Sequence, residues 1–262
     1  MEDYYIFCIN LKANILRRKI MIEQFNSLNF KYTICDAIDN KEISFIKETF
    51  NNYSEIRDGN FCIKGKIFNF NIKSSKYYQI TKNNGHVGCT LSHLYYIKKA
   101  YELNYENIIM LEDDISFKYI SKWNNKFKSI IKNAPSDWTI LKLHCSNYEI
   151  VKKYFKKEQY IKIPIDTVLF WSTGFYIINN KGMEYILDKY FDNKSNTFRI
   201  LEKFPVADYI LYKIPGVYYY SIPLVKNNNI DYNFKSDIIN RNTITNAEKK
   251  GISIVDDFYS SI

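Results

Sequence analysis

Residues 4–39 read YYIFCINLKANILRRKIMIEQFNSLNFKYTICDAID, and this stretch decides the fold class. Residues 4–10 form an apolar run typical of a buried strand. Residues 11–29 carry apolar side chains at roughly helical spacing, and 30–39 are rich in the β-branched and aromatic residues that favour a strand. A strand, a helix and a strand in so short a stretch form a βαβ unit, which predicts a parallel sheet covered by helices.

The same alternation of strands and helices continues along the chain. The patterns predict further strands and helices, with a short helix near 42–50 inside an accessory or mobile segment, 40–84. The strands are expected at 107–114, 138–144, 167–179 and 217–223, and the helices at 85–104, 181–191 and 207–214. The simplest organisation is one α/β domain, 1–240, followed by a C-terminal tail, 241–262. Its central sheet is expected to be mixed but mostly parallel, with helices on both faces.

The bulk composition fits a globular protein with one substantial core. The chain has 262 residues, of which 46% are hydrophobic and 17% aromatic. It contains no apolar run long enough to predict a transmembrane helix, and its start lacks the basic region of a signal peptide, so we expect a cytoplasmic protein. Its five cysteines form no Cys-x-x-Cys pair, which disfavours a disulfide framework or a zinc site.

The net charge of +9 comes mainly from lysine. Lysine, asparagine, isoleucine and tyrosine are all abundant, which indicates the codon bias of an AT-rich genome. We therefore attribute much of the charge to composition and do not expect a nucleic-acid partner, although a peripheral contact with an anionic membrane is compatible with it.

Three consecutive carboxylates, Glu112, Asp113 and Asp114, follow the apolar run at 108–111. Their mutual repulsion would be relieved by a divalent cation or by a shared proton, and hard oxygen ligands suit Mn²⁺ or Mg²⁺. On a strand, Glu112 and Asp114 would point the same way, which makes Asp114 the favoured direct ligand. Ordinary polar residues in a turn are the alternative interpretation. A metal-dependent phosphohydrolase or nuclease would use the same carboxylates, with Asp36 as an isolated further ligand.

The stretch GHVGCTLSHL, 85–94, predicts backbone and side-chain contacts to a ligand. Gly85 and Gly88 permit tight turns or a close approach, and Ser92 and His93 are candidate polar contacts. The stretch is neither a P-loop nor a dinucleotide-binding motif. A histidine satisfied within the core is the alternative for His93.

Two adjacent arginines follow the first strand. Asn10 ends that strand, and Arg17 and Arg18 lie on the next helix, where one of them would clamp a diphosphate or pair with an acidic group. A solvated helix face is the alternative for at least one of them.

Polar residues also interrupt two later apolar stretches. Ser172, Thr173 and Gly174 break the run at 167–179, which predicts a pocket wall where a ligand approaches the backbone. Asp208 is isolated between Ala207 and an apolar stretch. It is either a general base for an incoming hydroxyl or a charge at a helix N-terminus.

In this order, INLKANILRR, GHVGCTLSHL, IMLEDDI, STGFYIINNKG and DYIL resemble glycosyltransferase family 25 over roughly 4–240. This family includes bacterial lipooligosaccharide galactosyltransferases and collagen galactosyltransferases. The resemblance implies a GT-A-like fold, a UDP-sugar donor and Mn²⁺. It also implies transfer of a hexose, galactose before glucose, to a glycan, glycolipid or hydroxylysine-type acceptor, commonly with inversion. The length of the chain and the absence of a leader favour a bacterial or large-virus origin.

The resemblance also assigns roles to individual residues. The carboxylates at 112–114 stand where the family has its Asp-x-Asp-like metal motif, and Asp208 stands at the acid of a Pro-Val-Asp-like segment, which here reads Pro-Val-Ala-Asp. Ser172 replaces the first glycine of the family's Gly-Thr-x-x-Tyr segment. The residues expected at the nucleotide-sugar are Asn10, Arg17, Arg18, Gly85, Gly88, Ser92, His93, Glu112, Thr173 and Gly174, and the expected metal ligands are Glu112, Asp113, Asp114 and Asp237.

Overall fold

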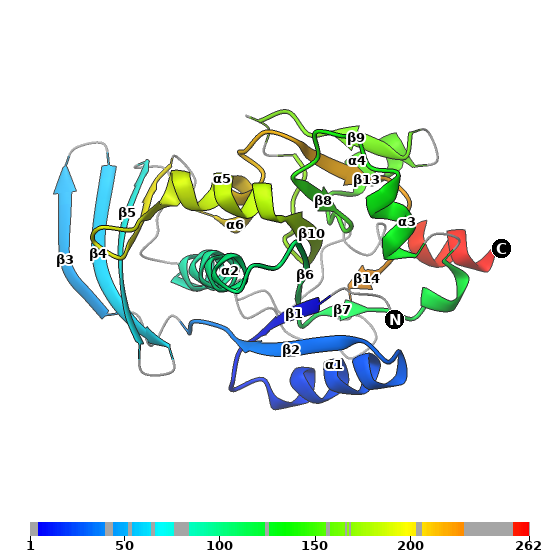
Figure 1. Ribbon diagram of the computed structural model, residues 1–262, viewed down its shortest axis with the longest axis horizontal. Helices are drawn as coiled ribbons and strands as arrows, with labels where there is room; N and C mark the ends of the chain where they lie inside the picture. Colours follow the sequence, from blue (N-terminus) through cyan, green and yellow to red (C-terminus); the bar gives the residue numbers. More distant parts are fainter. Residues whose placement is uncertain are drawn as a thin grey trace.

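The structure is a computed structural model with an α/β architecture (Figure 1). It describes residues 5–39, 44–51, 54–63, 66–75, 84–123, 126–155, 158–165, 167, 169–202, 206–227 and 254–261, with backbone alone for 44–75 and 84. The strands are β1 (Tyr5–Asn10), β2 (Lys31–Asp36), β3 (Ser44–Asn51), β4 (Ser54–Ile63), β5 (Lys66–Ser75), β6 (Asn107–Glu112), β7 (Ile115–Ser116), β8 (Ile140–Lys142), β9 (Tyr160–Lys162), β10 (Phe175–Asn179), β11 (Phe191–Asp192), β12 (Thr197–Leu201), β13 (Val217–Tyr220) and β14 (Lys226–Asn227). The helices are α1 (Ile15–Ser27), α2 (Asn84–Glu102), η3 (Ile120–Lys122), α3 (Phe127–Lys132), α4 (Tyr148–Tyr154), α5 (Asn180–Tyr190) and α6 (Ala207–Leu211), followed by a C-terminal helix at 254–260.

The central sheet has seven strands in the order β2-β1-β6-β10-β8-β13-β9. The predicted βαβ unit is confirmed, because β1 pairs in parallel with β2 and, on its other side, with β6. β10 is inserted antiparallel between β6 and β8, whereas β13 is parallel to β8 and antiparallel to β9. The sheet is therefore mixed, as expected, but parallel and antiparallel neighbours are equally frequent, so it is less parallel than predicted.

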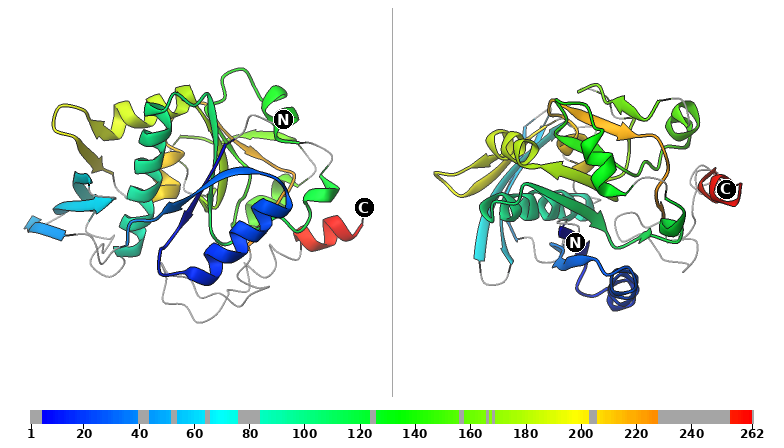
Figure 2. Two further views of the ribbon diagram at one scale, coloured as in Figure 1. Left: turned by 60° about the horizontal axis from the view of Figure 1, so that its bottom comes forward. Right: turned by 45° about the vertical axis from the view of Figure 1, so that its right-hand side comes forward.

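Helices cover both faces of this sheet and create two apolar cores (Figure 2). Successive side chains of β1 belong to different cores. Phe7 packs in the core under α2 and α5, and Ile6 packs in the core under α1 and α3. This alternation is the period-2 pattern of a strand buried on both faces. In α1, Met21 and Phe25 are fully buried against the second core.

A second sheet of five strands, in the order β11-β12-β5-β4-β3, lies beyond α5 (Figure 1). The short helix predicted near 42–50 is wrong, because residues 44–51 form β3 and pair along their length with β4. Ladder hydrogen bonds to a neighbouring strand have replaced the local helical bonds, a tertiary effect that a single-segment reading misses. The sheet is completed from a distant part of the chain, since β12 pairs in parallel with β5.

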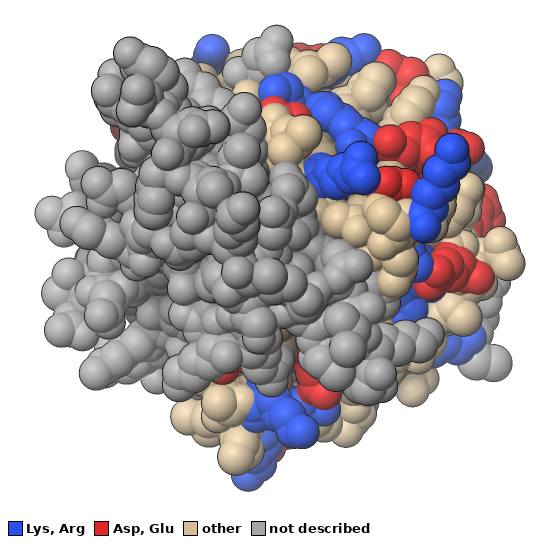
Figure 3. All heavy atoms as spheres, turned by 90° about the vertical axis from the view of Figure 1, so that its left-hand side faces the viewer, with Lys and Arg blue, Asp and Glu red and all other residues tan. Residues whose placement is uncertain are grey.

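On the face seen in Figure 3, lysines and arginines lie among acidic residues across the described part. Cys8, Cys35, Cys89 and Cys145 are free thiols. No helix within the described ranges is both long and apolar enough to cross a bilayer.

Candidate active site

The expected polar residues meet at the edge of the central sheet where β1 and β6 end. Ile9 lies beside Glu112 in the parallel register, and the Glu112 N–H donates to the Gly174 carbonyl at 3.0 Å. The carboxylates of β6 therefore face the segment that leads into β10. Open α/β sheets bind their ligands at this edge.

Asp113 is held by a buried ion pair. Arg17 Nη1 lies 2.9 Å from Oδ1, and Asn10 Nδ2 donates to Oδ2 at 2.7 Å. The interpretation in which an arginine pairs with an acid is confirmed for Arg17. Burial raises the pKa of Asp113, and the nearby guanidinium opposes that rise. Both of its oxygens are engaged by protein groups, which leaves it poorly placed to bind a metal directly.

Glu112 belongs to a different hydrogen-bonded chain. Its Oε1 accepts from Thr173 Oγ1 at 2.5 Å and lies 3.3 Å from His93 Nε2, whose Nδ1 is 2.9 Å from the hydroxyl of Tyr176. Burial opposes its ionisation, but the hydrogen bonds from His93 and Thr173 hold the pKa of Glu112 below its usual value. The side chain is 23% exposed, so part of the carboxylate stays accessible.

Asp114 lies in the turn after β6, because that strand ends at Glu112. The alternation rule therefore gives no basis for its direction. Asn227 Nδ2 of β14 donates to its Oδ2 at 2.9 Å. Burial, followed by the charges of Glu112 and Asp113, raises the pKa of Asp114 to about 7. The positive charge near Glu112, Asp113 and Asp114 is therefore too small to balance all three carboxylates in their ionised form.

A divalent cation fits this deficit. Glu112 and Asp114 offer the hard oxygen atoms that Mn²⁺ and Mg²⁺ prefer. Cys89, His93 and Glu112 also bring three ligand atoms within 4.8 Å of one another. Burial raises the pKa of the Cys89 thiol well above its usual value. For Mn²⁺ or Mg²⁺ the carboxylates are the better candidates, because these ions prefer oxygen ligands to sulfur.

Ser172 organises the opposite side of the site. Its φ of 87° lies in the left-handed region, where glycine is favoured, and this explains why the related family segment begins with glycine. The Ser172 carbonyl accepts from the buried ammonium of Lys142 and from the hydroxyl of Tyr212 at 2.9 Å. Its Oγ accepts from the Gly174 N–H at 3.0 Å and lies 2.9 Å from His144 Nδ1. These contacts hold a strained turn in one conformation.

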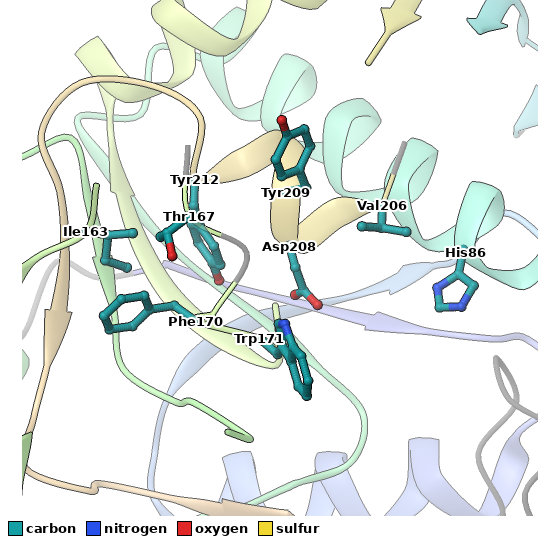
Figure 4. Close-up of a pocket in the computed structure, with 9 residues that line it drawn as sticks. All are labelled: His86, Ile163, Thr167, Phe170, Trp171, Val206, Asp208, Tyr209 and Tyr212. Atoms are coloured by element: carbon teal, nitrogen blue, oxygen red, sulfur yellow. The ribbon is translucent and has the colours of Figure 1, made fainter. Parts of the chain in front are cut away.

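Asp208 projects from α6 toward this turn. Its buried Oδ1 has no hydrogen-bond partner. Burial raises the pKa of Asp208, and the positive charge of Lys142 opposes that rise. Asp208 lines a cavity of about 300 Å³ together with Trp171 and Tyr212 (Figure 4). An unpartnered carboxylate oxygen at a cavity is suited to accepting a proton.

Several of the residues expected to bind a ligand are engaged by other protein groups or lie outside the described residues. Gly85 and Gly88 lie in the first turns of α2. Ser92 accepts from the Ile38 N–H at 2.8 Å and donates to the Gly88 carbonyl at 2.6 Å, which ties α2 to the loop after β2. Arg18 pairs with Asp36 at 2.8 Å. Asp237 lies outside the described residues. A ligand-binding role for each of these residues stays a prediction.

Sequence reasoning missed several residues of the site. Lys142, His144, Tyr212 and Asn227 contact its carboxylates or the Ser172 turn, and Trp171 borders the cavity. A lysine at the third position of the buried strand β8 was a usable signal, because an unpaired buried ammonium is rare. The others give no local signal, since their partners are distant along the chain.

Comparison with known proteins identifies the class of enzyme. The sequence profile of glycosyltransferase family 25 (LPS biosynthesis protein) matches residues 3–198. The chain belongs to this family of glycosyltransferases, as its motifs predicted, and the family implies a GT-A-like fold and a nucleotide-sugar donor. A glycosyltransferase 25 family member from Aedes aegypti is 24% identical over 249 residues, which is 92% of this chain and 34% of that protein. The chain therefore spans about a third of the length of that relative.

Proposed function

We propose that this glycosyltransferase moves a hexose from a UDP-sugar to a hydroxyl group with the help of Mn²⁺ or Mg²⁺. The observation that carries the proposal is the presence of two sets of carboxylates at one edge of the sheet. Glu112 and Asp114 form the first set, which has an excess of negative charge, and Asp208, with an unpartnered oxygen, is the second. Glu112 and Asp114 suit a metal-bound diphosphate, and Asp208 suits an attacking hydroxyl.

On the donor side, Asp114 and Glu112 would hold the metal, which would neutralise charge on the departing diphosphate. Arg17 would keep Asp113 ionised and fixed rather than contact the donor, because its guanidinium is already paired at 2.9 Å. Asn10 carries a buried oxygen, Oδ1, that has no partner, and it lies beside this pair. His93 and Thr173 would orient Glu112 through Oε1.

On the acceptor side, the Asp208 carboxylate would take the proton of the attacking hydroxyl. Burial raises the pKa of its carboxyl, which makes its ionised form a stronger base than an exposed aspartate. Direct displacement by that hydroxyl inverts the anomeric configuration. An NMR spectrum of the product, taken before mutarotation, would distinguish inversion from retention.

The rival reading as a two-metal phosphohydrolase or nuclease is disfavoured by the place of Asp36. It lies on β2, which is separated from β6 by β1, so it is about 10 Å away at the usual strand spacing of roughly 4.8 Å. It also forms an ion pair with Arg18 at 2.8 Å. Two-metal sites need ligands shared by ions about 4 Å apart, and Asp36 does not supply one.

Thermal unfolding in the presence of nucleotides tests the proposal. UDP, UDP-galactose and UDP-glucose should each raise the Tm when Mn²⁺ is present and raise it much less without the metal. Asp114→Asn should abolish the metal-dependent rise, whereas Asp188→Asn, an exposed aspartate on α5, should keep it. A nucleotide response that is equal with and without Mn²⁺ would refute the metal role, and no response to any nucleotide would refute the donor class.

The identity of the sugars is best found by a hydrolysis screen. We expect UDP-galactose to be consumed fastest and UDP-glucose next. We further propose that the acceptor is a glycan or glycolipid such as lipooligosaccharide, made on the cytoplasmic side of a membrane, rather than a hydroxylysine. The family description names LPS biosynthesis, which supports this choice.

A further inference from the structure

The lining of the cavity beside Asp208 does not include the carboxylates that would hold the metal. It is lined by His86, Ile163, Thr167, Phe170, Trp171, Val206, Asp208, Tyr209 and Tyr212. None of the carboxylates at 112–114 belongs to this lining, and neither does Asn10 or Arg17. In Figure 4 the carboxylate of Asp208 and the indole of Trp171 point toward one another across the cavity.

The charge of the described lining disfavours a phosphate-bearing ligand. Among the described residues that form it there is no lysine or arginine, and burial lowers the pKa of His86, so this imidazole is neutral at neutral pH. Asp208 is the one acidic side chain in that described set. A diphosphate in this cavity would meet a carboxylate without a compensating cation, which is unfavourable in a partly desolvated site.

The shape and polarity of the lining suit a sugar ring instead. Four aromatic side chains form much of the wall: Phe170, Trp171, Tyr209 and Tyr212. Trp171 is 52% exposed, so one face of its indole meets water rather than protein. A pyranose has an apolar face of C–H groups and a rim of hydroxyls. Its apolar face can cover the indole while its hydroxyls reach the carboxylate and the phenols.

Two further apolar side chains close to Trp171 in the sequence are exposed. Leu169 is 50% exposed and Ile165 is 47% exposed. The Asp208 carboxylate in the lining supplies the polar group that would fix the orientation of a ligand.

We infer that this cavity is the acceptor subsite and that it binds the neutral, non-reducing terminal sugar of a glycan by stacking the ring on Trp171. The inference rests on the proposed function. One sugar hydroxyl lies at the Asp208 carboxylate, which lines the cavity. The hydroxyl oxygen bonds to the anomeric carbon of the donor, the bond from that carbon to the diphosphate oxygen breaks with its electron pair, and Asp208 takes the hydroxyl proton.

A cationic acceptor is disfavoured by the same geometry. The ammonium group of a hydroxylysine would pair with Asp208, the one carboxylate among the lining residues that the structure describes. That contact would lower the basicity of the group that has to accept the proton. A neutral sugar leaves the carboxylate available.

Fluorine NMR of protein labelled with 5-fluorotryptophan tests the inference directly. The chain has three tryptophans, so three signals are expected, and Trp171→Phe assigns one of them. The probes are the methyl β-glycosides of galactose, glucose and N-acetylglucosamine, free hydroxylysine, and UDP with Mn²⁺. At least one glycoside should shift the Trp171 signal in a saturable manner, both without and with UDP. A matched variant, Trp138→Phe, should keep that response.

Three outcomes would overturn the inference. The first is a Trp171 signal that responds to UDP with Mn²⁺ and to no glycoside, which would make the cavity part of the donor site. The second is a stronger shift with hydroxylysine than with every glycoside. The third is no shift with any probe. The Mn²⁺-dependent Tm rise with UDP reports separately on the proposed function, so failure of one can be told from failure of the other.

Turnover gives a second readout. Trp171→Leu should raise the KM for a glycan acceptor at least tenfold while the KM for the UDP-sugar stays within twofold of wild type. Trp171→Phe should recover much of the loss, because it retains an aromatic face. Equal KM values for the acceptor in the leucine and phenylalanine variants would show that stacking is not involved.

Discussion

Replacing Lys142 by methionine removes the buried cation nearest to Asp208 and tests how the candidate base is kept ionised. Lys142 is fully buried and donates to the Ser172 carbonyl and to the Tyr212 hydroxyl at 3.2 Å. The positive charge of Lys142 lowers the pKa of Asp208.

The sign of the effect follows from the surroundings of Asp208. Burial raises the pKa of its carboxyl, Lys142 and His93 lower it, and Glu112 raises it. Without Lys142 the pKa rises further. An opposite charge close to a carboxyl is worth about 1–3 pKa units in proteins. The acid limb of the pH profile of kcat/KM should therefore move to higher pH by about one pH unit, the lower end of that range.

The stability of the Lys142→Met variant should change less than its activity. A charge-assisted hydrogen bond of about 1.5–3 kcal/mol is lost, but the cost of burying the ammonium disappears with it. The Ser172 carbonyl keeps the Tyr212 hydroxyl as a donor at 2.9 Å. We therefore expect urea unfolding to show a loss of about 2 kcal/mol or less.

Tyr212→Phe is the matched control. It removes the other donor to the Ser172 carbonyl but leaves the charge of Lys142 in place. Its acid limb should stay within a few tenths of a pH unit of wild type. An unchanged acid limb in Lys142→Met, or an equal shift in Tyr212→Phe, would refute the argument.

Three further substitutions test the backbone and the surface charges. Gly216→Ala should destabilise by about 3 kcal/mol or more in urea unfolding, because a Cβ there would lie 2.1 Å from the Asp137 carbonyl at a φ of +76°; a loss below 1 kcal/mol would contradict this. Ser172→Gly should be more stable than Ser172→Ala by about 1 kcal/mol, since both lose the hydroxyl but only alanine keeps the strain of a positive φ; equal Tm values would show that the turn is unstrained. Burial raises the pKa of Glu202, but the hydrogen bond from Lys213 at 2.7 Å contributes to a net lowering, so Glu202→Gln should cost about 1 kcal/mol at pH 7. This cost should vanish as the pH falls below the value of about 4.3 for a free glutamate, and a cost that persists in acid would exclude the charge as its cause.

The sequence predicted the parts of the fold that have a local periodic signal. The βαβ unit at the start, the helix over 85–104 and the strand before the carboxylates were all recognised, because buried strands and amphipathic helices differ in their spacing of apolar residues. The strand β3 was mistaken for a helix because its structure depends on pairing with β4. The strand predicted over 167–179 begins only at Phe175, since the preceding residues form the turn of the site.

The candidate site was predictable to the extent that its residues stand together in the sequence. The carboxylates, Asp208 and the Ser172 turn were all singled out, and the structure places them at one edge. The sequence did not predict which polar and charged side chains pair with each carboxylate. Arg17 and Asp113 are separated by 96 residues, and Asn227 and Asp114 by 113. No spacing rule connects such residues before the sheet order is known.

The parallel pairing of β5 with β12 has a consequence for synthesis of the chain. The three strands between 44 and 75 emerge from the ribosome more than a hundred residues before Thr197 arrives to cover the free edge of β5. During that interval the nascent protein exposes an unpaired strand edge, which is a template for association with other chains. Slow translation or premature termination before β12 thus favours aggregation, and chaperones that shield strand edges would improve the yield of folded enzyme.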